Sequence, residues 1–321
     1  MNWVPTRCGC DLALRARPLL LSVAGLCLAG AAQAGMLRHC APPPALTAAQ
    51  QDRLYRFADL VRGELDRSGQ RLALVARAGL DLRRFGQRYS HAGISLRASP
   101  NTPWSVRQLY LDCDAGQPQL FDQGLPGFVL GGADPDAGHI VLWLLPEAQA
   151  GALEAAALDS RQALRLLGGR YSANAHAGST RYQNCNQWVA ELLAQAWGRL
   201  PDSDQPRADA QQWLQQQGYV PTRIQVSNPL VTLAGLLLPW LHTDDHPADA
   251  LQRQEFDVSM PASIEAFVQR QVPGAQRIEF CLGPQQMVVR QGWVPLAEGC
   301  QAAPGDRVIP LGTGPAPAAG A

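Results

Sequence analysis

A cysteine at the start of a predicted helix is the residue of this sequence best placed for covalent chemistry. Cys185 follows Asn184, a good helix cap, and precedes a stretch with apolar residues at helical spacing. A thiol there faces unpaired backbone N–H groups and the positive end of the helix dipole, which favour the nucleophilic thiolate. The same N–H groups could hold an oxyanion. The alternative is a buried structural cysteine or a disulfide half, but the neighbouring Asn186 and Gln187 favour a functional role.

A nucleophilic thiol needs a general base, and the six histidines of the chain are the first candidates. His91 lies in a predicted strand, where alternation places it on one face with Gly93 and Ser95. We expect Gly93 to leave room for a helix end to approach the strand. The alternative is a solvated polar strand face. His176 is nearer to Cys185 along the chain, but its segment is loop-like and would position it poorly.

The elements that must position these residues predict an α+β fold. Helical spacing and end signals predict helices over 47–69, 147–167, 184–197, 208–217 and 261–270. Strand patterns cover 71–78, 89–97, 104–113, 139–145, 278–282 and 287–291. The second and third strands should form a hairpin, and so should the last two. Because strands and helices do not alternate regularly, the order favours α+β over a doubly wound parallel sheet.

The first 34 residues are predicted to be a secretory signal peptide. Three arginines, Arg7, Arg15 and Arg17, precede an apolar run over 19–32, and Ala32-Gln33-Ala34 supplies the small-residue pattern for cleavage after Ala34. We therefore expect a periplasmic or secreted protein without a transmembrane segment in the mature chain. The alternative is an uncleaved anchor, although the run is short for a bilayer. A second apolar segment, 230–241, is also too short to span.

Composition excludes several classes of protein. The 321 residues carry 27 basic and 27 acidic side chains, and 46% are hydrophobic, which suits a packed core and not a disordered chain. Basic residues are not in excess over acidic ones, so the composition does not indicate a nucleic-acid partner. All the basic residues are arginine, so lysine Schiff-base and phosphate-loop chemistry are excluded. Because no dinucleotide fingerprint or metal-ligand cysteine spacing occurs, we expect no cofactor and no metal.

Short motifs around these residues resemble the circularly permuted papain-like cysteine hydrolases, relatives of the NlpC-type cell-wall peptidases and of the lecithin-retinol acyltransferase group. The motifs are Ser90-His-Ala-Gly-Ile94, Gly169-Arg-Tyr171 and Asn184-Cys185. The histidine strand precedes the cysteine helix, which is the permuted order. Over residues 36–302 the chain more closely resembles an exported bacterial family known only as a domain of unknown function. That resemblance includes Arg77-Ala-Gly-Leu-Asp81, Tyr89–Ile94, Trp104-Ser-Val, Tyr171–Ala175, Tyr182–Trp188 and Asp245-His-Pro247.

The resemblance implies a circularly permuted papain-like fold. An antiparallel sheet should pack against the helix carrying Cys185, and a mixed α/β extension should follow. The expected divisions are a signal peptide over 1–34, the papain-like domain over 35–220, an extension with a closing hairpin over 221–305 and a disordered tail over 306–321.

The resemblance also implies roles for individual residues. Cys185 is the expected nucleophile, His91 the general base, and a polar side chain of the neighbouring strand should orient the imidazole. Gln108 and Asp112 share a face of that strand, and we select Gln108 because the superfamily uses His, Asn, Gln or Glu at this place. The backbone N–H of Cys185 should be one oxyanion donor. Candidates for the second donor are Tyr182, Gln183 and Asn184.

The cysteine count agrees with an unpaired nucleophile. Loss of the signal peptide leaves five cysteines, so one thiol should stay unpaired in an oxidising compartment. With Cys185 reduced, Cys281 and Cys300 flank the closing hairpin and form one expected disulfide. Cys40 and Cys113 then form the other by elimination.

We therefore expect a periplasmic or secreted cysteine hydrolase that acts on an amide or acyl bond, with cell-envelope peptide as the substrate class. One alternative is an acyltransferase or thioesterase that uses segment 230–241 as its acyl-binding surface. Another is a non-catalytic envelope binding protein on the same scaffold. His242 and His246 could ligate a metal, but flanking prolines favour a solvated loop. Their role and the oligomeric state stay open.

Overall fold

The computed structural model describes residues 40, 45–132, 134–228, 235 and 238–311. The chain divides into two units, Met1–Pro42 and Pro43–Ala321, and every described helix and strand belongs to the second. The predicted signal peptide lies outside the described residues. Within the described part, no helix has the length and apolar character needed to cross a membrane.

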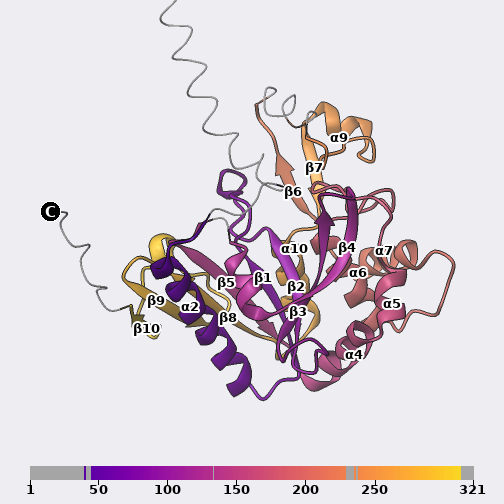
Figure 1. Ribbon diagram of the computed structural model, residues 1–321. Helices are drawn as coiled ribbons and strands as arrows, with labels where there is room; N and C mark the ends of the chain where they lie inside the picture. The colour runs from indigo at the N-terminus through magenta and orange to yellow at the C-terminus, as the bar shows by residue number, and fades with distance from the viewer. Residues whose placement is uncertain (1–39, 41–44, 133, 229–234, 236–237, 312–321) are drawn as a thin grey trace, which may run out of the picture. The chain divides into compact units, whose positions relative to one another are not determined.

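An eight-stranded sheet is the centre of the fold, and its strand order is β10-β9-β8-β5-β1-β2-β3-β4 (Figure 1). All neighbouring strands pair antiparallel. Its strands are β1 (Leu72–Arg77), β2 (His91–Leu96), β3 (Ser105–Asp112), β4 (Gln117–Gln123), β5 (Gly138–Leu144), β8 (Gln276–Leu282), β9 (Gln286–Gln291) and β10 (Arg307–Pro310). A separate antiparallel pair joins β6 (Thr222–Gln225) to β7 (Glu255–Val258).

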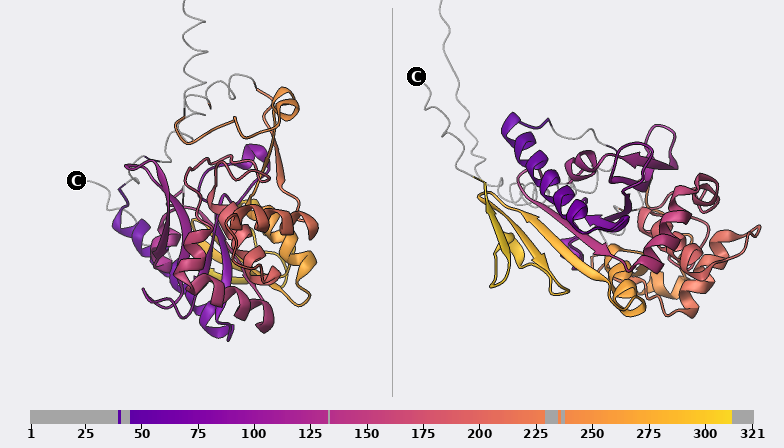
Figure 2. Two further views of the ribbon diagram at one scale, coloured as in Figure 1. Left: turned by 90° about the vertical axis from the view of Figure 1, so that its right-hand side faces the viewer. Right: turned by 90° about the horizontal axis from the view of Figure 1, so that it is seen from below.

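Helices complete an α+β architecture, the class expected from the sequence. They are α2 (Ala48–Arg67), α3 (Leu125–Leu130), α4 (Glu147–Leu158), α5 (Ser160–Arg165), α6 (Cys185–Gly198), α7 (Pro206–Gln216), α9 (Ala248–Gln252) and α10 (Pro261–Gln271). Two short 3₁₀ turns, η1 and η2, cover Arg83–Phe85 and Glu298–Cys300. The views in Figures 1 and 2 place α2 apart from the group formed by α4, α5, α6 and α7.

Helix α2 begins with a capping box. The Thr47 hydroxyl accepts a hydrogen bond from the Gln50 backbone N–H, and the Gln50 side chain accepts one from the Thr47 backbone N–H. The buried side of α2, including Phe57 and Val61, packs on the sheet face that carries Val75. This contact forms one extended apolar cluster of the core.

The structure differs from the sequence-based expectation where local capping was overlooked. The single helix expected over 147–167 is two helices, because the Asp159 carboxylate accepts hydrogen bonds from the N–H groups of Arg161 and Gln162 and starts a new helix.

The C-terminal part of the chain also differs from the expectation. The expected disordered tail over 306–321 contains β10, and its last residues, 312–321, lie outside the described part. The extension expected after residue 220 supplies β8, which pairs with β5 in the main sheet.

Helix α6 is buried along most of its length, and it packs against α4, α7, β2 and β3. The Asn184 side chain caps it, accepting a hydrogen bond of 2.7 Å from the Gln187 backbone N–H. Arg199 ends the helix in the left-handed conformation, with φ of 46°. This cap and packing fix Cys185 in the first helical turn, beside the sheet.

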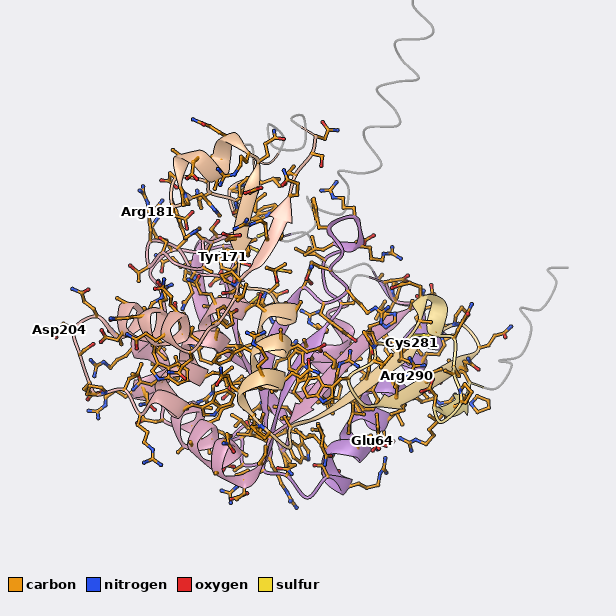
Figure 3. The ribbon with its side chains drawn as sticks, turned by 180° about the vertical axis from the view of Figure 1, so that it is seen from behind. Glu64, Tyr171, Arg181, Asp204, Cys281 and Arg290 are labelled. Carbon is orange, nitrogen blue, oxygen red and sulfur yellow. A yellow bond between two sulfur atoms is a disulfide. The ribbon has the colours of Figure 1, made fainter. Side chains whose placement is uncertain are left out.

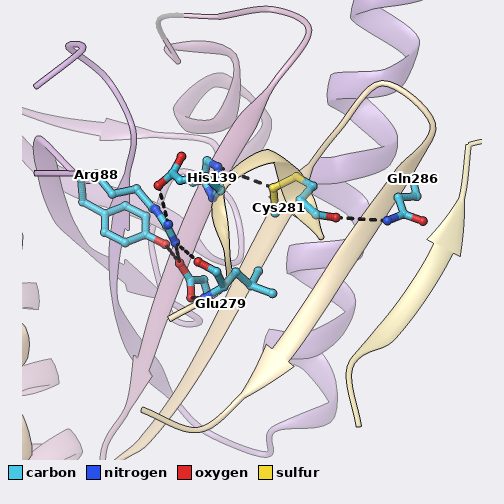
Figure 4. Close-up of a disulfide and its surroundings, with 9 residues drawn as sticks. Arg88, His139, Glu279, Cys281 and Gln286 are labelled. Atoms are coloured by element: carbon cyan, nitrogen blue, oxygen red, sulfur yellow. Dashed lines mark hydrogen bonds and ion pairs between the residues drawn. A yellow bond between two sulfur atoms is a disulfide. The ribbon is translucent and has the colours of Figure 1, made fainter. Parts of the chain in front are cut away.

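A disulfide joins Cys281 of β8 to Cys300, and the two Cα atoms are 5.5 Å apart. In Figure 4, His139 lies beside this bridge, with Nε2 3.6 Å from the Cys281 Sγ, and Gln286 donates to the Cys300 carbonyl oxygen. Cys40 and Cys113 are also disulfide-bonded. Cys185 is the free cysteine of the described residues.

Removing the Cys281–Cys300 bridge by a double substitution to serine is expected to lower the free energy of unfolding by about 2–4 kcal/mol, since the bridge restricts the unfolded chain. Urea unfolding of both proteins measures the difference. Cys185→Ser, which breaks no disulfide, is the matched control. Equal unfolding midpoints for the double variant and the wild type would contradict this expectation.

Candidate active site around Cys185

His91 and Gln108 meet on the neighbouring strands β2 and β3. The His91 Nε2 and the Gln108 Oε1 are 2.5 Å apart, and both side chains are buried, with 8% and 1% of their surface exposed. The Gln108 Nε2 donates to the Gln123 Oε1 at 2.7 Å. Because the amide nitrogen of Gln108 donates to Gln123, the carbonyl oxygen of Gln108 faces the imidazole. This oxygen can only accept, so it accepts a hydrogen bond from the His91 Nε2–H. In the neutral ring, the Nδ1 is then the basic nitrogen.

Asp112, the other residue considered for this role, serves the β3–β4 turn. Its Oδ1 accepts hydrogen bonds from the backbone N–H groups of Asp114 and Ala115, and its Oδ2 accepts one from Gln119. The carboxylate is therefore a turn cap, whereas Gln108 contacts the histidine.

Gly93 makes room for the neighbouring strand, and not for a helix end as the sequence suggested. A Cβ placed on Gly93 would lie 3.3 Å from the Gln108 Cβ and 3.1 Å from the Arg107 carbonyl oxygen. It would also collide with the Val106 side chain. The missing side chain thus lets β3 approach β2 closely enough for the contact between His91 and Gln108.

The Cys185 sulfur lies against β2 at the residue after His91. It interacts with the backbone N–H of Ala92, with that of Asn186 and with its own N–H. The side chain is 6% exposed. Burial raises the pKa of the thiol to about 11, although these three amides and the charge of Arg77 act in the opposite direction. The amides at the helix start favour the thiolate, as expected, but burial outweighs them and the resting group is a neutral thiol.

The side chains of the three additional oxyanion candidates have other partners. Tyr182 stacks on His242 with ring centres 4.4 Å apart. Gln183 accepts from the Gly168 N–H and donates to the Glu191 carboxylate. Asn184 caps α6. The donors at the sulfur are instead backbone amides, those of Cys185, Asn186 and Ala92.

Three polar residues near the sulfur were missed as site residues when the sequence was considered alone. Arg77 and Tyr171 both interact electrostatically with Cys185, and Arg77 also hydrogen-bonds with the Tyr110 hydroxyl. The Tyr110 ring lies 5.7 Å from the His91 ring. Arg77 carried a usable signal, because it is the one charged residue of an otherwise apolar strand.

The remaining histidines of the loops belong to a different cluster. His176 and His246 have ring centres 5.3 Å apart, and the His246 Nε2 donates to the Asn174 carbonyl oxygen at 2.8 Å. His242 stacks on Tyr182, and its backbone N–H is bonded to Ser172. These contacts join the segment before α6 to the loop that contains His242 and His246. Most of the apolar segment 230–241 lies outside the described residues, and of its described part Leu238 and Trp240 are buried.

One cluster of the described residues has donor atoms close enough for a metal ion: His139 with Cys281 and Cys300. The two sulfurs are bonded to each other, so in this form the cysteines are not thiolate ligands. Figure 3 labels Cys281 and Tyr171 far apart in the view, which separates this cluster from the surroundings of Cys185.

Comparison with known proteins identifies a family but no characterised relative. The model of a family described as "Uncharacterized protein conserved in bacteria (DUF2145)" matches residues 64–268, which is more than half of the chain. The matched region contains β1–β5, α6 and all the residues placed around Cys185. Searches of the curated proteins and of the solved structures gave no match. The chain therefore belongs to this bacterial family of uncharacterised proteins.

Proposed function

We propose that this protein is a cysteine hydrolase that cleaves an amide or other acyl bond. Cys185 is the nucleophile, His91 is the general base, and Gln108 holds the imidazole ring in orientation. The observation that carries the proposal is the hydrogen bond from His91 to Gln108 on strands β2 and β3. Helix α6, which begins with the free Cys185, packs against these two strands. A nucleophile, a base and a residue that orients the base are the parts that such a reaction needs.

The chemistry begins from a neutral thiol, because burial raises the pKa of Cys185 to about 11. His91 removes the thiol proton as the sulfur attacks the carbonyl carbon, and the oxygen of that carbonyl becomes an oxyanion. The backbone amides at the start of α6 stabilise this charge. The imidazolium then protonates the leaving group, and a thioester remains on Cys185. Water hydrolyses the thioester with His91 again acting as base, which restores the thiol.

The proposal extends to fold family and location. The order of a histidine strand followed by a cysteine helix supports assignment to the circularly permuted papain-like hydrolases. The pattern of residues 1–34 supports export to the periplasm or beyond, with cleavage after Ala34. An exported hydrolase of this kind has cell-envelope peptide as its proposed substrate class.

A second candidate function is a non-catalytic binding protein of the envelope on the same scaffold. The observation that favours it is the burial of Cys185, which is 6% exposed and has a pKa raised to about 11. A thiol in that environment, without help from a base, is about one part in 10⁴ thiolate at pH 7 and reacts slowly.

The rate of alkylation by iodoacetamide as a function of pH distinguishes these functions. If His91 is the base, Cys185 should react at pH 7 at least about tenfold faster than in His91→Ala. In that variant the rate should rise tenfold per pH unit until about pH 11, because only the free thiolate reacts. His176→Ala is the matched control and should behave as the wild type. Overlapping pH curves for the wild type and His91→Ala would favour the binding protein.

A further inference from the structure

Arg77 is a buried cation at the end of a central strand. It is the last residue of β1, where its register partner in β2 is His91. Its side chain is only 4% exposed. In an antiparallel pair, directly opposed side chains lie on the same face, with Cβ atoms about 5 Å apart. The guanidinium and the imidazole therefore share one face of the sheet.

The guanidinium has hydrogen-bonding capacity that no described residue uses. Its Nε and Nη1 are buried without a partner, and it forms none of the ion pairs found among the described residues. The Phe128 ring packs against it, with the Cζ 5.1 Å from the ring centre. Gly131 also leaves room for it, since a Cβ there would lie 2.8 Å from the Cζ. The protein thus makes space for this group without supplying its anion.

A buried charge without a partner is costly, and proteins keep one where a ligand supplies the opposite charge. A cavity of about 10 Å³ adjoins the side chain on the side away from Cys185 and His91, which do not line it. Its lining is mostly apolar, with Leu54, Phe57 and Val129, and it includes the exposed Asp134. The Oδ1 of Asp134 accepts a hydrogen bond from the Asp136 N–H and is not ion-paired with Arg77. A space of this size is just large enough for one oxygen atom, such as one oxygen of a carboxylate.

We propose that Arg77 is the anion-binding group of this site and that it holds a carboxylate of the substrate while Cys185 attacks the neighbouring acyl group. The proposal rests on the proposed function for the presence of a substrate at Cys185. It adds a substrate class: acyl compounds or peptides that carry a carboxylate close to the bond that is cleaved. The charge of Arg77 acts on Cys185 as well, and it favours the thiolate over the thiol.

Two alkylating reagents of the same shape test this assignment, because iodoacetate carries a carboxylate and iodoacetamide does not. The quantity measured is the ratio of the two second-order rates at Cys185, divided by the same ratio for the protein unfolded in urea. In the wild type, this normalised ratio of the iodoacetate rate to the iodoacetamide rate is expected to lie between about 10 and about 100. In Arg77→Gln it should fall to about one. Changes in the thiolate fraction affect both reagents equally and cancel.

Two further variants separate a specific site from general electrostatics. Arg84→Gln removes an exposed arginine and should keep the wild-type ratio. Gly131→Ala keeps every charge but displaces the guanidinium, and it should lower the ratio. Acetate should protect Cys185 from iodoacetate, whereas acetamide should not; stronger protection by inorganic phosphate than by acetate would overturn the carboxylate assignment.

A normalised ratio near one in the wild type would overturn the proposal, even if Arg77→Gln did not fold. That outcome leaves the proposed hydrolase untouched, since its test is the dependence of the iodoacetamide rate on His91. A different result would be a high normalised ratio that Arg77→Gln lowers to about one, with an iodoacetamide rate that His91→Ala does not change. That result would support an anion-binding protein without catalysis.

Discussion

Replacing His91 with alanine is expected to lower the rate of acyl transfer to Cys185 by about 10²–10⁴-fold, the usual contribution of a positioned general base. The effect should be large because the thiol is neutral at rest, its pKa being raised to about 11 by burial. Without an acceptor for the proton, attack depends on the small thiolate fraction. The release of nitrophenol from an activated nitrophenyl ester, followed in a single turnover, measures this rate.

Gln108→Leu should give a smaller loss than His91→Ala, because the base is retained and only its hydrogen bond of 2.5 Å is removed. His176→Ala should leave the rate unchanged, since this ring packs against His246. Raising the pH should restore much of the rate in His91→Ala as Cys185 ionises directly. A rate in His91→Ala equal to that of the wild type at pH 7 would remove His91 from the mechanism.

Replacing Glu191 with alanine is expected to lower the free energy of unfolding by about 3–5 kcal/mol. Its fully buried carboxylate is paired with Arg207 through hydrogen bonds of 2.9 and 3.1 Å. Arg207 also donates to the carbonyl oxygens of Thr180 and Tyr182, just before the cysteine helix. Loss of the carboxylate would leave a buried, unpaired cation that anchors this segment.

Urea unfolding of Glu191→Ala measures the cost, and Asp249→Ala is the control. Asp249 pairs with Arg253 on the surface, where both side chains are more than half exposed, so its loss should cost less than about 1 kcal/mol. The double variant Glu191→Leu with Arg207→Met should be more stable than Glu191→Ala, because no unpaired charge remains. Similar stabilities for Glu191→Ala and Asp249→Ala would contradict this account of the network.

Much of the fold could be predicted because its signals are local. The capping box at Thr47 and the apolar spacing of α2 are properties of neighbouring residues, and so are the alternation in β2 and the turn between β2 and β3. The elements that were missed have weak local patterns. Strand β4 is polar and lies at the sheet edge, and β10 is four residues long. Their places depend on pairing with β3 and β9, which the local pattern does not encode.

The candidate site shows the same division. The N-cap of α6 and the strand position of His91 follow from adjacent residues, and strand alternation limited the orienting residue to Gln108 or Asp112. The choice between these two depends on Gln123, a residue of the missed strand β4 that fixes the Gln108 amide. The raised pKa of Cys185 and the unpartnered nitrogens of Arg77 arise from burial in the folded chain. Burial depends on packing between distant segments, which local spacing does not reveal.

The central claim is that Cys185 forms a covalent bond with an acyl group with the help of His91. Exposure of the protein to an activated acyl ester, rapid acid quenching and peptide mapping by mass spectrometry test it most directly. The account predicts an acyl thioester on the peptide that carries Cys185, absent in Cys185→Ala and strongly reduced in His91→Ala. A Cys185 peptide that stays unmodified in the wild type, or that is acylated equally with and without His91, would contradict it.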